Sequence, residues 1–413
     1  MPSSTLLQLV ARGRQDLYLT NNPQMTFFKH IYRRHTPFAI ESIPIEFDGT
    51  PEFGRRISTL IPHNAELLGS LFLEIDLPAL PNVSGTQYYW TNDIGHSIIQ
   101  DVSIEIGDKE VDKHTGEWLY IWSELTVPSD KRDGFNNMVG HWNVYPDNPF
   151  SVGPLKLSIP LRFWFCNTIG AALPLIALQA HPVRIVMHLR PFQELWWCED
   201  LIAPNPACSQ ITPVSPTRFQ LFGDYYFLEK EERQRFAAVE HEYLIEQIQY
   251  TPVQSVPKNI ASINIPLVFN HCCKEFFWVV RQDRMSKSHE WFNYSSVKAG
   301  EARIPDDLLD TTLLRLDGYD RFYRRAARYF RMTQPYQYHT VIPNNYIYLY
   351  SFSLRPESDQ PSGSLNCSKI DDIIMNLTFN PALLSTDRSV VVYATNYNIL
   401  RIVGGLGGLA FYA

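Results

Sequence analysis

The sequence predicts an all-β protein that contains two similar domains. Short segments with apolar residues at alternate positions recur along the chain, and no long segment has helical periodicity. The composition agrees, since 13% of the 413 residues are aromatic and 29 prolines outnumber 20 glycines. Aromatic residues favour strands, whereas proline interrupts helices. Only 19% of the residues are charged, which indicates a surface partly covered by partners.

The first half of the chain contains clear strand patterns and one helical pattern. Residues 116–125 have apolar side chains at helical spacing, and residues 126–154 are rich in Pro, Gly, Asn and Asp, as in a long loop. Alternating apolar residues predict strands over 71–77, 102–106, 155–161 and 183–189.

The second half repeats the order of strands and turns of the first half. The residues are not identical, but the patterns follow one another in the same order. The matched segments are 71–77 with 276–281, 104–108 with 314–318, 155–165 with 346–354, 183–189 with 372–379, and 219–228 with 389–400. A duplicated all-β domain, either a sandwich or a jelly roll, follows from this order.

Turn-forming residues suggest where the chain divides. Residues 198–217 are rich in proline and are predicted to be a linker. Near the N-terminus, a short helical pattern ends before Pro23. We therefore expect an N-terminal arm over 1–25, a first domain over 26–210 and a second domain over 211–413.

Charge and terminal sequence exclude several classes of protein. The 36 Lys and Arg against 43 Asp and Glu give a formal net charge of −7, which argues against a protein that coats nucleic acid with its whole surface. No run of about 20 apolar residues could span a membrane, and Leu6–Ala11 is too short for the core of a signal peptide. The six cysteines form no C-x-x-C pair, which predicts reduced thiols in a protein made in the cytoplasm.

The motifs of common enzymes and metal sites are absent from the sequence. Nucleotide-binding, zinc-protease and serine-hydrolase patterns do not occur. His30 and His35 flank a pair of arginines, whose charge disfavours a metal ion. His271-Cys272-Cys273 could supply ligands, but no second cluster completes a set of four. We expect no catalytic residue, no cofactor and no metal.

One basic cluster contains five arginines interleaved with aromatic residues such as Tyr323 and Phe330. Arginines beside aromatic rings could bind nucleic acid. The alternative, which the acidic remainder of the chain favours, is that they pair with carboxylates within or between subunits. The arginines are Arg321, Arg324, Arg325, Arg328 and Arg331.

Four asparagines occur in N-x-Ser/Thr glycosylation sequons. Asn82 and Asn293 lie in predicted loops and are candidate acceptors. Asn366 and Asn376 also match, but Asn376 lies inside a predicted strand. Because no secretion signal precedes the chain, an unmodified chain is the favoured expectation.

A series of motifs in collinear order over nearly the whole chain resembles the major capsid proteins of the nucleocytoplasmic large DNA viruses. No single motif is decisive, but the ordered set is specific. The motifs are Gln15–Thr20, Asn22–Lys29, Tyr32–Ala39, Asn92–His96, Gly116–Leu119, Ala172–Leu178, Glu231–Arg233, His241–Gln247, Tyr350–Leu354, Gln360–Gly363 and Asn396–Arg401.

The resemblance implies two eight-stranded antiparallel jelly rolls in tandem. It implies a homotrimeric capsomer with a hexagonal outline, which contacts neighbouring capsomers and tiles an icosahedral shell around an internal membrane and DNA. Minor capsid proteins at the inner face are the further expected partners, without catalysis, specific binding of nucleic acid or a membrane span.

Two further expectations follow for a capsid subunit. The arm over 1–25 should lie on the inner face and adapt to partners, and the loops over 126–154 and 284–308 should form the outer face.

A minor capsid paralogue remains an alternative. The runner-up class is a carbohydrate-binding or glycan-cleaving jelly roll, which would need exposed aromatic residues on one sheet face or a pair of carboxylates about 5–10 Å apart.

Overall fold

The computed structural model describes residues 3–83, 86–142, 152–198, 211–298 and 304–412. The chain forms two units, residues 1–37 and 38–413. The first unit contains α1 (Ser3–Val10) and α2 (Arg14–Thr20), and its large apolar side chains are exposed. The predicted arm over 1–25 falls inside this unit, which extends to Pro37.

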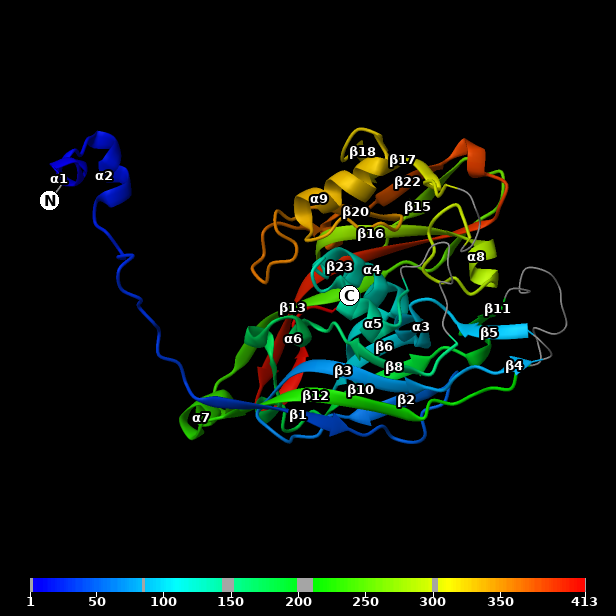
Figure 1. The fold of residues 1–413 in the computed structure, drawn as a ribbon, viewed down its shortest axis with the longest axis horizontal. Coiled ribbons are helices and arrows are strands. Elements are labelled where there is room, and N and C mark those ends of the chain that lie inside the picture. The colour runs from blue at the N-terminus through cyan, green and yellow to red at the C-terminus, as the bar shows by residue number, and fades with distance from the viewer. Residues whose placement is uncertain (1–2, 84–85, 143–151, 199–210, 299–303, 413) are drawn as a thin grey trace. The chain divides into compact units, whose positions relative to one another are not determined.

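The first jelly roll consists of a five-stranded and a four-stranded antiparallel sheet, and the fifth strand of the larger sheet is the short β9 (Leu173–Pro174), which pairs with β3 (Figure 1). In the long strand β3 (Leu67–Leu77), buried and half-buried residues alternate from Leu71 onward, as the period of two requires when one face covers a core. One sheet has the order β1 (Phe38–Ile45), β12 (Arg218–Leu228), β3 and β8 (Leu155–Pro160); the other has the order β2 (Arg56–Leu60), β10 (Val183–Leu189), β6 (Ile99–Ile106) and β7 (Lys109–Thr115).

The second jelly roll repeats the four-strand order in each sheet and adds short strands, which make its sheets seven-stranded and five-stranded. One sheet has the order β13 (His241–Tyr250), β23 (Arg388–Val403), β16 (Cys272–Gln282) and β20 (Ile347–Ser351); the other has the order β15 (Ser262–Pro266), β22 (Ile373–Phe379), β17 (Leu309–Leu316) and β18 (Tyr319–Asp320). In each sheet of both domains, the pairing runs antiparallel.

The strands matched by sequence occupy equivalent places in the two jelly rolls. β3 and β16 each lie third in their sheet, between the last strand of the domain and a shorter edge strand. The other matched pairs, β6 with β17, β8 with β20, β10 with β22 and β12 with β23, are likewise equivalent. The predicted all-β fold of two tandem eight-stranded jelly rolls is confirmed.

The boundary between the domains differs from the expected one. β12 was assigned to the second domain, but it pairs with β1 and β3 in the first jelly roll. Of residues 198–217, predicted as a linker, 199–210 lie outside the described part; Cys198 ends β11 (Trp196–Cys198), and Thr217 directly precedes β12 of the first jelly roll. We propose to draw the boundary after Leu228, where α7 (Lys230–Ala238) leads into β13.

The two sandwiches also contain short helices and short strands, some of which pair with the long strands of the sheets. The predicted helix over 116–125 is α4 (Gly116–Thr126), and the predicted loop after it contains α5 (Arg132–Val139), while residues 143–151 lie outside the described part. The remaining helices are α3 (Ile94–Ile98), α6 (Trp164–Asn167), α8 (Asp283–Lys287), α9 (Gln334–Tyr338) and the turns η1 (Ile169–Ala171), η2 (Leu175–Ala177), η3 (Phe192–Glu194), η6 (Tyr329–Thr333), η7 (Cys367–Lys369) and η8 (Pro381–Leu383). The remaining strands are β4 (Asn82–Val83), β5 (Thr86–Trp90), β9 (Leu173–Pro174), β14 (Gln254–Val256), β19 (Arg325–Ala326), β21 (Leu365–Asn366) and β24 (Leu406–Leu409).

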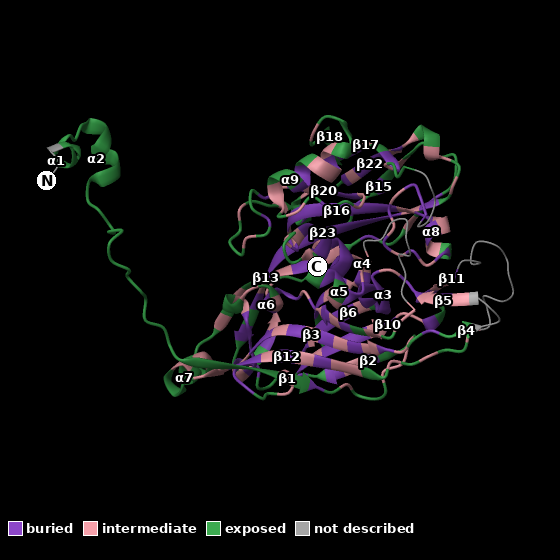
Figure 2. Ribbon diagram, in the orientation of Figure 1, coloured by how far each residue is buried: buried purple, intermediate pink, exposed green. Residues whose placement is uncertain are grey.

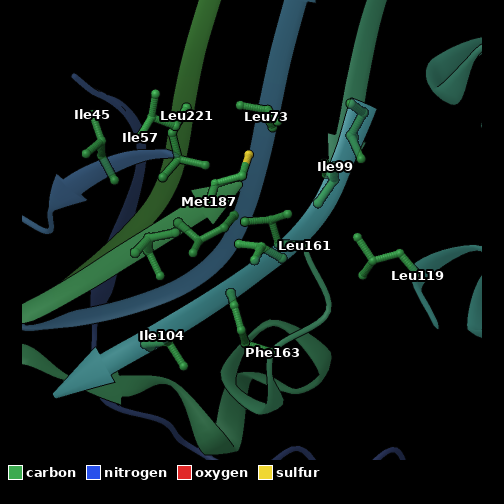
Figure 3. Packing of buried hydrophobic residues seen from close by; sticks show 14 of the residues in the cluster. Ile45, Ile57, Leu73, Ile99, Ile104, Leu119, Leu161, Phe163, Met187 and Leu221 are labelled. Carbon is green, nitrogen blue, oxygen red and sulfur yellow. The ribbon is translucent and has the colours of Figure 1, made fainter. Parts of the chain in front are cut away.

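Each jelly roll encloses its own apolar core, and a third apolar cluster lies where the two domains meet. In the first core, Leu73, Ile104, Met187 and Leu221 come from four strands of the two facing sheets and are fully buried (Figure 3). The buried segments run along the strands of both sandwiches (Figure 2). Burial of this apolar surface is the main favourable contribution to folding.

Candidate assembly surfaces

Helix α4 belongs to the first jelly roll and packs against the second, and its N-terminus closely contacts the backbone of the first. The helix begins after Thr115, whose Oγ1 accepts a hydrogen bond from the backbone N–H of Trp118 at 3.1 Å. A Cβ at Gly116 would lie 2.2 Å from the carbonyl oxygens of His96 and Ile99. Only glycine therefore allows this close approach.

The apolar side of α4 packs against the second jelly roll. Trp118 is buried, and its ring centroid lies 5.1 Å from that of Phe277 in β16 and 5.7 Å from that of Tyr393 in β23. Ile121 and Leu125 belong to the same buried cluster. The sheet face that the second jelly roll turns outward is thus covered by a helix from the first jelly roll.

A carboxylate of α4 anchors this contact. Glu117 accepts hydrogen bonds from the hydroxyl of Tyr393 at 2.7 Å and from that of Tyr294 at 3.1 Å. It also pairs with Arg281 at 3.3 Å. Burial raises the pKa of both tyrosines, so they remain donors. The carboxylate is therefore held by three groups of the second domain.

The strand edges of the two domains also meet. The side chain of Gln247 in β13 donates a hydrogen bond to the carbonyl of Val111 in β7. The backbone N–H of Ile248 donates to Oδ1 of Asp112 at 3.1 Å. These contacts and α4 fix the two jelly rolls side by side.

The motif Asn92–His96 holds a helix turn of the first domain against α5. Asp93 bonds His96 at 2.6 Å and His141 at 3.1 Å. Burial acts to raise the pKa of Asp93, but the two histidines hold it well below its usual range. This carboxylate is therefore ionised and holds His96 of α3 and His141, which follows α5, together.

A set of buried charges lies in the second domain. Lys274, only 1% exposed, pairs with Glu246 and donates to the carbonyl of Pro356 at 2.7 Å. The neighbouring Glu275, fully buried, bonds His339 at 3.1 Å.

His339 also bonds Glu357, at 2.8 Å. Burial alone would lower the pKa of His339, but Glu275 and Glu357 raise it to about 9. Sequence reasoning missed this network. The signal was available, because Lys274-Glu275 interrupts the apolar run of β16 with two charges.

The arginine cluster divides into one half-buried and four exposed side chains. Arg331 pairs with Asp307 at 3.0 Å and lies over the ring of Tyr346, so it contributes inside the domain. Arg324 donates to Asn376 at 2.7 Å and to Thr378 at 2.9 Å. The exposed arginines are Arg321, Arg324, Arg325 and Arg328.

Exposed tyrosines accompany these arginines. Tyr319 is 81% exposed and Tyr323 is 90% exposed. Arg321 lies over the ring of Tyr350, and Arg325 lies 4.7 Å from the ring centroid of Tyr329. We name the side chains of Tyr319, Arg321, Tyr323, Arg324, Arg325 and Arg328 the Arg–Tyr surface. Arginine and tyrosine are enriched at protein interfaces.

The two candidate glycosylation sites differ in environment. Asn82 is exposed in β4, although Ser84 of its sequon lies outside the described residues. The amide nitrogen of Asn293, where a glycan would be attached, donates to Glu290 at 2.7 Å and to the carbonyl of Val297 at 2.9 Å. A glycan on Asn293 would have to displace both bonds, so Asn82 is the more accessible of the two.

The predicted loop over 284–308 contains α8, and its central residues 299–303 lie outside the described part. Asp307, in the same predicted loop, is bound by Arg331 and by the hydroxyl of Tyr348 at 2.8 Å. This acid therefore stabilises the domain.

The expectation of six reduced thiols is wrong for Cys198, which is disulfide-bonded. Cysteine spacing could not reveal this, because a disulfide depends on which thiols the folded loops bring together. Cys166, Cys272, Cys273 and Cys367 are free, and Cys208 lies outside the described residues.

The described ranges contain neither a cluster of metal ligands nor a helix that could span a membrane. No group of three or more His, Cys, Asp or Glu side chains gathers there as metal ligands would. None of the helices in these ranges has the length and apolar character needed to cross a membrane.

Comparisons with known proteins agree over nearly the whole chain. Residues 26–229 match a family described as the major capsid protein N-terminus, and residues 232–408 match the large eukaryotic DNA virus major capsid protein family. The major capsid protein of Pyramimonas orientalis virus is 38% identical, with 98% of each chain covered. That of Paramecium bursaria Chlorella virus 1 is 35% identical and covers 98% of this chain and 99% of the relative.

Solved structures give the same result. A quasi-atomic model of the PBCV-1 virus capsid has a TM-score of 0.78 at 32% identity and covers 94% of this chain and 100% of that chain. The Faustovirus major capsid protein has a TM-score of 0.74 at 13% identity, covers 97% of this chain and 96% of that chain, and supports the fold alone. The two family matches meet between residues 229 and 232, next to the end of β12.

Proposed function

Because this chain belongs to the major capsid protein family of large eukaryotic DNA viruses, we propose that three copies close into a capsomer with a hexagonal outline. The chain is a structural capsid protein of the virion. The proposal concerns how the subunits associate, and it starts from the duplicated fold.

The observation that carries the proposal is the rigid joint between two similar jelly rolls. α4, Glu117 and the contact of β7 with β13 fix one domain beside the other. A threefold ring of such subunits contains six similar domains and closes without an unmatched surface. A flexible joint could not specify that closed geometry.

The Arg–Tyr surface is our candidate for part of the subunit interface. Its arginines can pair with carboxylates of a neighbouring copy, whose chain has an excess of acidic residues. Its tyrosines supply apolar area with a polar end. Obligate interfaces commonly bury more than about 2,000 Å², so further surfaces must contribute.

The remaining assignments follow from a capsid role. Neighbouring capsomers and minor capsid proteins at the inner face are the proposed partners, close to an internal viral membrane, and the chain is made in the host cytoplasm. It carries out no catalysis and binds no cofactor or specific nucleic acid. The arm contacts inner partners, and the loops over 126–154 and 284–308 face outward.

Light scattering on the purified protein tests the trimer. We expect a mass of three times 47.8 kDa and hexagonal particles by electron microscopy. Replacing Arg321, Arg324 and Arg325 together by glutamate should shift the protein toward monomer. The matched control is Arg55→Glu, since Arg55 is exposed on the first jelly roll. A monodisperse monomer of the unmodified protein would refute the trimer, and an unchanged trimer in the triple variant would remove the Arg–Tyr surface from the interface.

A further inference from the structure

A cleft of about 1120 Å³ opens between the two jelly rolls. The first jelly roll contributes the end of α4, α5, and residues 162–171, which include α6. The second contributes the start of β13 and residues 356–361. α6 lies beside β13 (Figure 1). Because 162–171 follow β8 and 356–361 follow the equivalent strand β20, the cleft lies at the same end of both sandwiches.

Arg162 lines this cleft with an uncompensated charge. The residue is half-buried, and its guanidinium lies 6.0 Å from the ring centroid of Phe135. Within the described ranges, no carboxylate or other acceptor lies within bonding distance of the guanidinium. Burial lowers the pKa of Arg162, as expected for a cation removed from water without a counter-charge.

Two of the acids around the cleft, the half-buried Glu246 and the exposed Glu357, already have partners. Glu246 pairs with Lys274, and Glu357 bonds His339. The remaining charged side chains of the cleft, apart from Arg162, lie at its exposed rim, where water solvates them. There Glu242 pairs with Arg401 at 2.6 Å, and Asp130, Lys131 and Asp359 are exposed.

An unpaired guanidinium that is partly removed from water is unfavourable for the isolated protein. A carboxylate brought by a ligand would relieve this cost, because arginine forms two parallel charge-assisted hydrogen bonds with a carboxylate. The free-energy cost of the unpaired Arg162 would thus be removed on binding, and its removal would add to the affinity for the ligand.

The cleft that Arg162 lines has aromatic walls. Trp122, Trp164, Tyr243 and Tyr397 line the cleft together with Phe135. Aromatic walls around one polar anchor are typical of sites that hold a ligand's apolar side chain and orient it by a single charge. The volume and this lining suit a few residues of peptide.

We propose that this cleft is a docking site for a peptide segment of a partner protein, which places an acidic side chain on Arg162 and an aromatic side chain against the tryptophan-lined walls. The site belongs to one subunit, so the inference does not depend on the trimer.

The test compares two blocked peptides that differ only in charge, acetyl-Gly-Trp-Glu-Trp-Gly-amide and its counterpart with glutamine in place of glutamate. Binding to the full-length protein is measured by calorimetry. We expect the acidic peptide to bind about tenfold more tightly, as one charge-assisted interaction provides. Arg162→Gln should abolish the difference and leave the affinity for the neutral peptide unchanged.

Controls separate a docking role from a structural one. Lys131→Gln removes an exposed cation from the rim and should preserve the tenfold preference. Arg162→Gln should melt at the same or a higher temperature than the unmodified protein, because the replaced charge lacks a partner. If this variant does not fold, Arg162→Lys keeps the charge, loses the bidentate geometry and should weaken the preference.

Three results would overturn the proposal. The two peptides could bind equally, or the preference could persist in Arg162→Gln, in which case Arg162 does not select the carboxylate. Inorganic phosphate could displace the acidic peptide at matched concentration, in which case the site is a general anion site without a peptide partner.

Discussion

Trp118→Ala tests whether α4 makes the two jelly rolls behave as one body. Trp118 is 2% exposed and contacts Phe277 and Tyr393 of the second domain. Truncating a buried tryptophan costs about 3–5 kcal/mol, because apolar contacts are lost and a cavity remains. For a domain of this size, that loss lowers the melting temperature by roughly 10 °C.

The position of the cavity decides how the protein unfolds. In the unmodified chain, α4 couples the domains, so we expect one calorimetric transition. Trp118→Ala should lower that transition and separate it into two, since the second jelly roll loses the helix that covers its sheet. The scans are run at a fixed protein concentration, because association also changes apparent stability.

Trp90→Ala is the matched control. Trp90 is fully buried, but it lies in the core of the first jelly roll, where its ring centroid is 6.0 Å from that of Phe192. This variant should lose similar stability without uncoupling the domains through the joint. If both variants show the same pattern of transitions, the reasoning that α4 couples the domains is wrong.

The remaining predictions concern buried charges, one glycine and the arm. His339 has a folded pKa of about 9, so it contributes roughly 3 kcal/mol to the free energy of unfolding below about pH 6.5, and this contribution is lost as the pH rises through 9. Denaturant titrations at a series of pH values should show this fall in stability. A fall of equal size in His339→Gln would contradict the prediction. Lys274→Met leaves Glu246 without its buried partner and should cost about 3–5 kcal/mol, whereas an unchanged midpoint would mean that the pair contributes nothing. Gly116→Ala forces a Cβ into two carbonyl oxygens and should lower the melting temperature, whereas Gly134→Ala, which has open space, should not. Deleting residues 1–25 should spare the folded capsomer and impair shell assembly, and an unfolded product in circular dichroism would show that the arm belongs to a core.

The strands were predictable because their signal is local. In β3 the alternation reflects one buried face; the alternating apolar residues of β6 and β10 could also be recognised from the sequence, although both strands bury consecutive residues as well. The order of the matched segments also determined the duplication. It also favours a boundary after β12, since 219–228 matches 389–400, the last long strand of the second domain. The proline-rich segment before β12 favours an earlier boundary, because prolines are typical of linkers.

The candidate site was less predictable because its parts are distant in sequence. Glu117 meets Tyr393 across 276 residues, and Lys274 meets Glu246 across 28. No local pattern indicates which charged side chain will have an ion-pair partner in the folded protein. The sequence around Arg162, which follows a predicted strand, therefore does not distinguish it from other arginines. The helical spacing of 116–125 predicted α4, but it could not show that the helix covers a sheet of the other domain.

The strand pattern, the duplication and the resemblance to a capsid family follow from the chain alone, because periodicity and motif order are properties of the chain. The pairing of β12, the joint made by α4, the disulfide of Cys198 and the uncompensated charge of Arg162 became visible only in the folded protein. These features depend on which surfaces meet when the two sandwiches pack. The free energy of such contacts comes from burial and charge compensation between distant segments, which a one-dimensional pattern does not contain.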